Sequence, residues 1–237
     1  IYTMARNFTE RMDAVQTPMV AYPGSSSGGT WGFIDKTGKE IIAATFEEAY
    51  PFSNGRARVK QSGAYGFISR TGSTIVSAIY EDASDFSDGL AQVRFKNKNG
   101  FIDQAGKIVV PFKYDEAYGF RNGRARIKIN NLYGYIDKTG REIISPMYAS
   151  ASDFSEGLAV VGDRYEKYIY IDSTGNGFST LYKKAGIFKN GRAVVQLSDN
   201  GRYALLDRSG KETPCFFMDE EGAYRRIVIN NKTGILD

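Results

Sequence analysis

Three pairs of adjacent carboxylates are the residues in this chain whose types and spacing could support catalysis. They recur at intervals of 34 residues as Glu47-Glu48, Glu81-Asp82 and Asp115-Glu116. Two carboxyl groups roughly 5–10 Å apart across a cleft can act as the acid and the base or nucleophile of a glycoside hydrolase. Neighbouring side chains on a strand point apart, however, and a catalytic site is normally built at one place. We therefore expect these carboxylates to be structural, and a glycan-active hydrolase is the alternative.

The absent residue types exclude most other chemistry. The chain has no histidine and one cysteine, Cys215. This composition excludes Ser-His-Asp and Cys-His catalysis, histidine metal sites and thiolate clusters. Cys215 precedes Phe216 and Phe217, a setting typical of a buried small hydrophobic residue. We expect no cofactor and no bound metal.

A recurring aspartate offers a second candidate chemistry, a ladder of calcium sites. Each such aspartate is followed by glycine three residues later, but the dense carboxylate pattern of a calcium loop is missing. Asp-x-x-Gly is instead a tight-turn signal, in which the carboxylate caps the turn and glycine takes a positive φ. We expect turn caps at Asp35, Asp103, Asp137, Asp172 and Asp207.

Composition and charge limit the class of partner. Lysine and arginine number 31 against 27 acids, giving a net charge of +4, and the basic residues are spread along the chain. A nucleic-acid-binding protein usually gathers them on one face, so we expect no nucleic-acid partner. No apolar run of 18 residues is present, which excludes a membrane-spanning helix. A hydrophobic fraction of 42% is enough for a sizeable core.

Internal repeats determine how these residues are positioned. The segment Trp31-Gly32-Phe33-Ile34-Asp35 returns in related forms every 34 or 35 residues. Six units begin at Trp31, Tyr65, Asn99, Tyr133, Tyr168 and Tyr203, and a partial seventh begins at Thr233. Such regular self-similarity is typical of a stacked repeat architecture.

Each unit carries three strand signals. In the first unit they are the Trp-Gly segment, the run Ile41-Ile42, and Ala57-Arg58-Val59, with Arg58 facing outward. Between the last two, Phe46, Ala49 and Phe52 follow at intervals of three, which predicts one short helical turn with its aromatics in the core.

The predicted fold is all-β, with six three-stranded antiparallel meander repeats of about 34 residues. A propeller-like ring and an open twisted repeat array both fit this pattern. One meander cannot bury both faces alone, so we expect residues 31–237 to form one cooperative domain. Residues 1–30 are predicted to be an N-terminal cap or partial repeat, with residues 18–22 supplying a strand beside the Trp-Gly segment.

The repeat resembles the bacterial WG-repeat family, also called KWG repeats. The resemblance rests on Trp31-Gly32-Phe33-Ile34-Asp35-x-x-Gly38 and on Gly89-Leu90-Ala91-Gln92-Val93. Only the first unit keeps Trp-Gly, and units five and six replace the glycine with Ile169 and Ala204, which puts their local geometry in question. The resemblance implies a non-catalytic β-repeat array, often at the bacterial cell envelope.

A second period spans two units. Units one, three and five place Arg56, Arg124 and Arg192 after Asn-Gly, whereas units two, four and six place Asp88, Glu156 and Glu221 before glycine. Tyr50 and Tyr118 of units one and three give way to Ser84 and Ser152. Either the arginines face the acids of neighbouring units, or the period reflects ancestry and the arginine stems cover apolar surface. We predict a binding stripe formed by Arg56, Arg124, Arg192, Tyr50 and Tyr118.

These observations favour a non-catalytic binding or scaffold module. Its repeat loops would present themselves to a protein, a peptide or a cell-wall glycan. A purely structural spacer is a further alternative. We expect the protein in the bacterial cell envelope or outside the cell, with the cytoplasm as the alternative.

Overall fold

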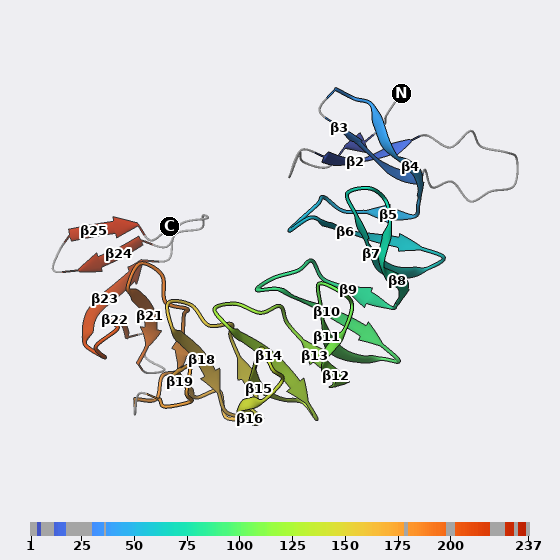
Figure 1. Cartoon of the computed structure of the whole chain (residues 1–237). Helices are drawn as coiled ribbons and strands as arrows, with labels where there is room; N and C mark the ends of the chain where they lie inside the picture. The colour runs from blue at the N-terminus through green and yellow to red at the C-terminus, as the bar shows by residue number, and fades with distance from the viewer. Residues whose placement is uncertain are drawn as a thin grey trace, which may run out of the picture. The chain divides into compact units, whose positions relative to one another are not determined.

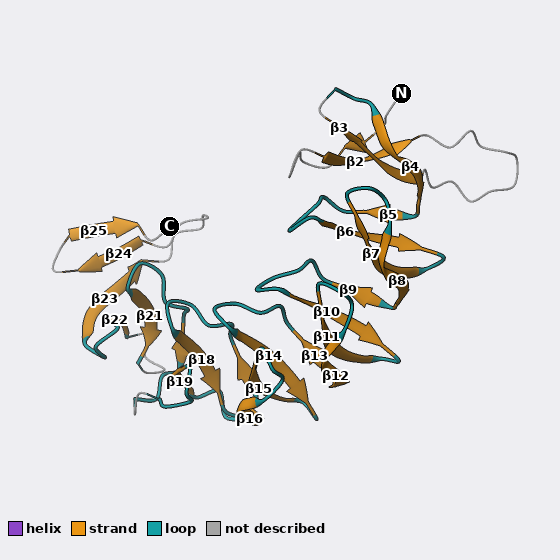
Figure 2. Cartoon of the chain, in the orientation of Figure 1, coloured by secondary structure: helices purple, strands orange, loops and turns teal. Residues whose placement is uncertain are grey.

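The chain is a set of small antiparallel β-sheets. A computed structural model describes residues 4–5, 12–17, 30–35, 37–177, 180–197, 202–218, 226–229 and 232–235. Within these ranges every regular element is a strand and none is a helix (Figure 2). None of the described residues therefore belongs to a helix capable of crossing a membrane. The all-β prediction is confirmed.

The chain divides into two compact units, Ile1–Phe120 and Arg121–Asp237 (Figure 1). The first contains β1 (Met4–Ala5), β2 (Met12–Thr17), β3 (Thr30–Asp35), β4 (Glu40–Phe46), β5 (Glu48–Ala49), β6 (Arg56–Gln61), β7 (Ala64–Ser69), β8 (Thr74–Tyr80), β9 (Asp82–Ala83), β10 (Leu90–Phe95), β11 (Lys98–Asp103), β12 (Ile108–Tyr114) and β13 (Glu116–Ala117). The second contains β14 (Arg124–Ile129), β15 (Leu132–Asp137), β16 (Glu142–Tyr148), β17 (Ser150–Ala151), β18 (Leu158–Gly162), β19 (Tyr168–Asp172), β20 (Lys184–Ala185), β21 (Arg192–Gln196), β22 (Tyr203–Asp207), β23 (Glu212–Met218), β24 (Arg226–Ile229) and β25 (Lys232–Ile235).

Three long strands form an antiparallel meander in each described sheet except that of β17, β18 and β19, which has two long strands beside the two-residue strand β17. In the second sheet these are β6, β7 and β8, with the two-residue strand β5 along the free edge of β6. The third sheet repeats this order with β9 to β12. The predicted meander is thus present, and the short edge strand brings each of these sheets to four strands.

The sheets are offset from the sequence units by one strand. Strand β6, the last of the first sequence unit, pairs with β7, the Trp-Gly-type strand of the second, with Arg58 opposite Phe67. A tight hairpin turn at Ser62 and Gly63, both with positive φ, joins the two strands. Each sheet is therefore built from two consecutive sequence units.

The predicted helical turn between sheets is wrong. The backbone of Glu48 and Ala49 pairs instead with Lys60 and Val59, so this part of the connection is extended and forms β5. The aromatic residues of the connection are nevertheless in the core, as predicted. The Phe33 and Phe52 ring centres lie 4.8 Å apart, and equivalent pairs recur in Phe67–Phe86, Phe101–Phe120 and Tyr135–Phe154.

The N-terminal strand differs from the prediction. Strand β2, Met12–Thr17, occupies the position beside β3, whereas residues 18–22 lie outside the described residues. Met12 pairs with Asp35 and Thr17 with Thr30.

Within each compact unit, consecutive sheets pack against each other, and we call the interface between consecutive sheets a seam. The first seam joins Trp31, Phe33, Ile42 and Phe46 of the first sheet to residues of the connection and the second sheet. Because both Phe33 and its neighbour Ile34 are buried, the Trp-Gly strand is covered on both faces.

The glycine of the Trp-Gly motif allows a bulge in the neighbouring strand. Trp31 pairs with Phe46 and Phe33 with Ile42, so β4 carries extra residues opposite Gly32. A Cβ atom at Gly32 would lie 2.6 Å from the carbonyl oxygen of Ile42. Where Ala204 replaces this glycine, β22 and β23 pair in continuous register. The local geometry at Ala204 therefore differs from that at Gly32, as the loss of the glycine led us to expect.

Candidate functional site

A cluster of charged and aromatic side chains lies where the second sheet meets the third. We call it the Arg58 cluster, and it consists of Glu48, Tyr50, Arg58, Lys60, Tyr65 and Asp85.

Strand geometry brings the members of the cluster together. Arg58 and Lys60 are two residues apart on β6 and therefore share a face. Lys60 pairs with Glu48 on one side and with Tyr65 on the other. Side chains directly opposite on antiparallel strands lie close enough to interact.

Arg58 links two sheets. Its guanidinium carbon lies 3.6 Å from the centre of the Tyr50 ring. Its Nε lies 3.2 Å from Oδ1 of Asp85, and its Nη1 donates a hydrogen bond to the carbonyl oxygen of Ala83. The Arg58 side chain is only 15% exposed, so stacking and pairing both act in a partly desolvated setting.

Glu48 is saturated with donors. The hydroxyls of Tyr50 and Tyr65 donate to its Oε2 at 2.8 and 3.1 Å, and the Lys60 ammonium donates to its Oε1 at 3.1 Å. Partial burial acts to raise the pKa of Glu48, but these hydrogen bonds outweigh it and lower the pKa. Burial and the bond to Glu48 raise the pKa of Tyr65. Glu48 is therefore held as a carboxylate, unsuited to act as a general acid.

The other paired carboxylates also make contacts within the fold. Glu47 accepts hydrogen bonds from the backbone N–H of Gly63 in the β6–β7 turn, at 3.0 and 3.1 Å. Glu81 holds the next hairpin in the same way, through the N–H of Asn97. Glu116 accepts from the Tyr118 hydroxyl at 2.6 Å. These contacts support the structural interpretation of the pairs.

The second compact unit, Arg121–Asp237, repeats the contacts that Arg58 makes in its cluster. The Nε of Arg126 lies 3.4 Å from Oδ1 of Asp153, and its Nη1 donates to the carbonyl oxygen of Ala151. The Tyr133 ring has Arg126 at 5.6 Å and Lys128 at 5.0 Å from its centre. The charged contacts thus recur with the two-unit period.

The predicted stripe is only partly brought together. Tyr50 belongs to the Arg58 cluster, and Tyr118 binds Glu116. Arg56 instead donates from Nε to the carbonyl oxygen of Gln104 at 2.8 Å. Arg124 donates in the same way to Ser173 at 3.3 Å, and Arg192 is exposed. These arginines lie at the first residues of β6, β14 and β21.

The acids expected opposite those arginines are Asp88, Glu156 and Glu221. Oε2 of Glu156 accepts a hydrogen bond from the backbone N–H of Gly191 at 2.8 Å. Asp88 lies in the turn before β10 with a positive φ, and Glu221 is outside the described residues. Two residues further along the strands, Arg58 pairs with Asp85 and Arg126 with Asp153 across the seams, and Asp153 also lies 3.7 Å from Nε of Arg121.

A signal in the sequence could have identified this pairing. Arg58 and Arg126 occur in the units that also carry Tyr50 and Tyr118, and each precedes a unit with Ser-Asp at the matching position. The fifth unit has Val194 and Gly186 at these places, so arginine and tyrosine are lost together.

The recurring aspartates cap turns, as predicted. Oδ1 of Asp35 accepts from the backbone N–H groups of Thr37 and Lys39 at 2.8 and 3.1 Å. The same contacts recur at Asp103, Asp137, Asp172 and Asp207. Among the residues whose side chains the structure describes, no cluster of three acidic or cysteine ligands could hold a metal.

Solved structures similar to the chain are β proteins of low sequence identity. Hsv2 of Kluyveromyces lactis is 10% identical, with a TM-score of 0.46 over 94% of this chain and 87% of that one. BamB of Moraxella catarrhalis is 10% identical, with a TM-score of 0.44 over 94% and 78%. Virginiamycin B lyase of Staphylococcus aureus is 11% identical, with a TM-score of 0.38 over 96% and 91%. No curated protein sequence matches the chain.

A family model of the WG containing repeat matches the chain four times. The matches cover residues 31–63, 65–98, 100–133 and 133–163, more than half of the sequence. They coincide with the units that keep the glycine opposite the strand bulge. The chain therefore belongs to the family of proteins with WG containing repeats.

Proposed function

We propose that the chain is a non-catalytic binding module that presents a repeated surface to an extended partner, a protein, a peptide or a cell-envelope glycan. The observation that carries this proposal is the repetition of the charged seam contacts, Arg58 with Asp85 and Arg126 with Asp153. Repeat arrays bind along their repeat axis because neighbouring units offer similar groups at regular spacing.

The contacts of the carboxylates also favour binding over catalysis. Glu47 holds a hairpin turn and Glu48 is surrounded by three donors. A glycoside hydrolase needs one carboxyl that can release a proton to the leaving group. The lowered pKa of Glu48 is opposed to that role.

Arg192 is the member of the proposed stripe best suited to a test. Its side chain is exposed, so its replacement removes a charged contact without opening the core. Purified protein would be measured on arrays of peptidoglycan fragments, soluble glycans and peptides. We expect Arg192→Ala to weaken capture of the bound class by about tenfold with an unchanged unfolding midpoint.

Lys211→Ala is the matched control, because it removes one exposed positive charge from a turn in the same compact unit, Arg121–Asp237. Equal losses of capture in both variants would show that the effect comes from net charge and not from the position of Arg192. Turnover of a glycan that disappears in Glu48→Gln would establish the hydrolase alternative instead.

A further inference from the structure

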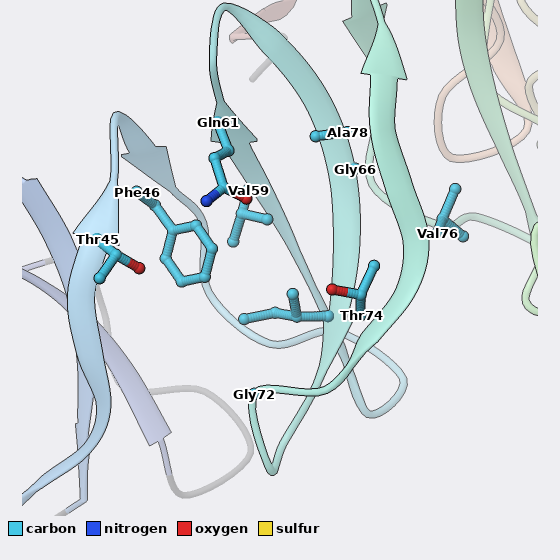
Figure 3. A pocket seen from close by; sticks show the side chains of 10 residues that line it. Thr45, Phe46, Val59, Gln61, Gly66, Gly72, Thr74, Val76 and Ala78 are labelled. Carbon is cyan, nitrogen blue, oxygen red and sulfur yellow. The ribbon is translucent and has the colours of Figure 1, made fainter.

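A cavity of about 220 Å³ lies between β4 and the second sheet (Figure 3). Thr45 and Phe46 of β4 line one side, and Thr74 and Ala78 of β8 line the other. Val59, Gln61, Gly66, Ile68, Gly72 and Val76 complete the lining. Apolar cavities of about 150 Å³ bind benzene, whereas sites for drug-sized ligands start at about 300 Å³. The space fits one aromatic ring.

The next seam shows what fills the equivalent space. Phe95 and Phe112 lie 34 residues after Gln61 and Ala78. Their ring centres lie 5.6 Å apart, and 6.3 and 6.1 Å from that of Tyr80, the counterpart of Phe46. The cavity therefore exists because the side chains of Gln61 and Ala78 are smaller than the phenyl rings of Phe95 and Phe112 at the equivalent positions of the next seam.

The strand backbone leaves room for a ring against glycine. A Cβ atom at Gly100 would lie 2.7 Å from Cδ1 of Phe112, so this ring rests on the glycine. Gly66 is the counterpart in the cavity; the β8 backbone lies close to it, with a Cβ atom there 2.7 Å from the nitrogen of Ala78, but Ala78 carries no ring. An incoming ring would take the place that the Phe112 ring occupies one repeat later.

The cavity differs from the filled seam in its polar rim. Thr45, Gln61 and Thr74 are exposed, and within the described part of the chain their side chains make no hydrogen bond. The equivalent of Gln61 in the last seam of the described chain is Leu197, packed on the core. A lining that combines apolar side chains, such as Phe46 and Ile68, with the hydrogen-bonding groups of Thr45, Gln61 and Thr74 suits a ring that carries a hydroxyl.

Two edge strands border the cavity. Strand β4 pairs only with β3 and β8 only with β7 among the described strands, so each has an open edge. The equivalent strands β12 and β16 carry Pro111 and Pro146, which block pairing at a sheet edge, whereas β4 and β8 carry no proline. The large apolar side chains Ile41 and Ile79 are 44% and 54% exposed on these open strands. An extended peptide suits such a border.

We propose that this cavity binds a tyrosine side chain of an extended peptide that lies along the β4 and β8 edges. The proposal rests on the proposed function, since it names the partner class and one site of the same binding module. The phenol ring occupies the space beside Phe46 and Ile68, and its hydroxyl bonds to Gln61 or a threonine at the rim.

The test follows the methyl NMR signals of Val59 and Ile68 in the intact chain. The probes are p-cresol, toluene, and pentapeptides of glycine with tyrosine or alanine at the centre. We expect saturable shifts with p-cresol and the tyrosine peptide, with the peptide at least as tight, and weaker binding of toluene. The alanine peptide should cause no shift.

Ala78→Phe fills the space in the manner of Phe112, and we expect it to weaken tyrosine-peptide binding by about tenfold or more. Ser77→Phe adds the same ring at an exposed neighbouring position and should leave binding within about twofold. Gln61→Leu copies Leu197 and should remove the preference for p-cresol over toluene.

Several results would overturn the proposal. One is the absence of shifts at Val59 and Ile68 with the tyrosine peptide. Another is p-cresol binding without peptide binding, which would assign the cavity to a free small aromatic molecule. Unchanged peptide affinity in Ala78→Phe would place the peptide elsewhere. If Arg192→Ala still weakens capture on the peptide and glycan arrays, the proposed binding function holds even though the cavity does not bind the peptide.

Discussion

The guanidinium of Arg58 lies over the ring of Tyr50, with its central carbon 3.6 Å from the ring centre. The same guanidinium reaches Asp85 and Ala83 of the next sheet. One side chain therefore stacks on its own sheet and ties it to its neighbour. A planar group is needed for both contacts.

Arg58→Lys should destabilise the chain by about 1–2 kcal/mol, although charge is conserved. The loss comes from the stacked geometry and from the hydrogen bond to Ala83. Urea unfolding would measure the change. Arg94→Lys is the control, since Arg94 pairs with Glu81 at the surface and its side chain is 46% exposed. Equal effects of the two variants would show that stacking on Tyr50 contributes nothing.

Gly66→Ala should destabilise the chain by about 1–3 kcal/mol or more. The new Cβ would lie 2.5 Å from the carbonyl oxygen of Val76 and 2.7 Å from the nitrogen of Ala78, both backbone atoms that cannot swing aside. Gly119→Ala is the control, because a Cβ there meets nothing within 4 Å. Thermal unfolding separates the two, and a neutral Gly66→Ala would mean that the β8 bulge relaxes freely.

Much of this fold was readable from the sequence because its signals are local. Gly32 and Asp35 act through the backbone next to them, and the register of the repeat reveals both. The offset between sheets and sequence units was not readable, because a tandem repeat carries no mark of which neighbouring strands share a sheet. The hairpin at Gly63 decides this pairing.

The same offset explains why Arg58, and not Arg56, makes the ion pair with the next sheet. Alternation in Ala57-Arg58-Val59 places Arg58 on the face away from its core neighbours, which predicts an outward position. That face is covered by the next sheet, so Arg58 becomes partly buried and pairs with Asp85. Arg56, which precedes the strand core, uses its guanidinium on the Gln104 carbonyl.

The turn-capping aspartates should make the chain sensitive to acid. Hydrogen bonds, first of all from the Thr139 side chain, lower the pKa of Asp137 from 3.8 to about 2. The pKa values of Asp35, Asp172 and Asp207 are lowered by equivalent bonds, from Thr37, Thr174 and Ser209. Because the folded-state pKa lies below the unfolded value, the stabilisation is present above about pH 4 and is lost as the pH falls to about 2.

Carboxyl NMR titration would place the Asp137 midpoint, and urea unfolding at several pH values would follow its contribution. Asp137→Ser should reduce the loss of stability between about pH 4 and 2. Serine retains an acceptor, as at Ser69, whose Oγ accepts from the N–H groups of Thr71 and Ser73. An Asp137 midpoint near the ordinary value would contradict the capping argument.

Trp31 tests whether the repeats unfold together. It is the only tryptophan and is 7% exposed in the first seam, so its fluorescence reports that seam, whereas far-UV circular dichroism reports all the sheets. A stack whose sheets bury each other's faces should lose them together. We expect the two signals to give the same urea midpoint, and Trp31→Ala to lower stability by about 3–5 kcal/mol when followed by circular dichroism.

Trp31→Phe, which keeps a ring in the seam, should lower stability clearly less than Trp31→Ala. A fluorescence transition at lower urea than the circular dichroism transition would mean that the first seam opens alone, and residues 31–237 would then not form one cooperative domain.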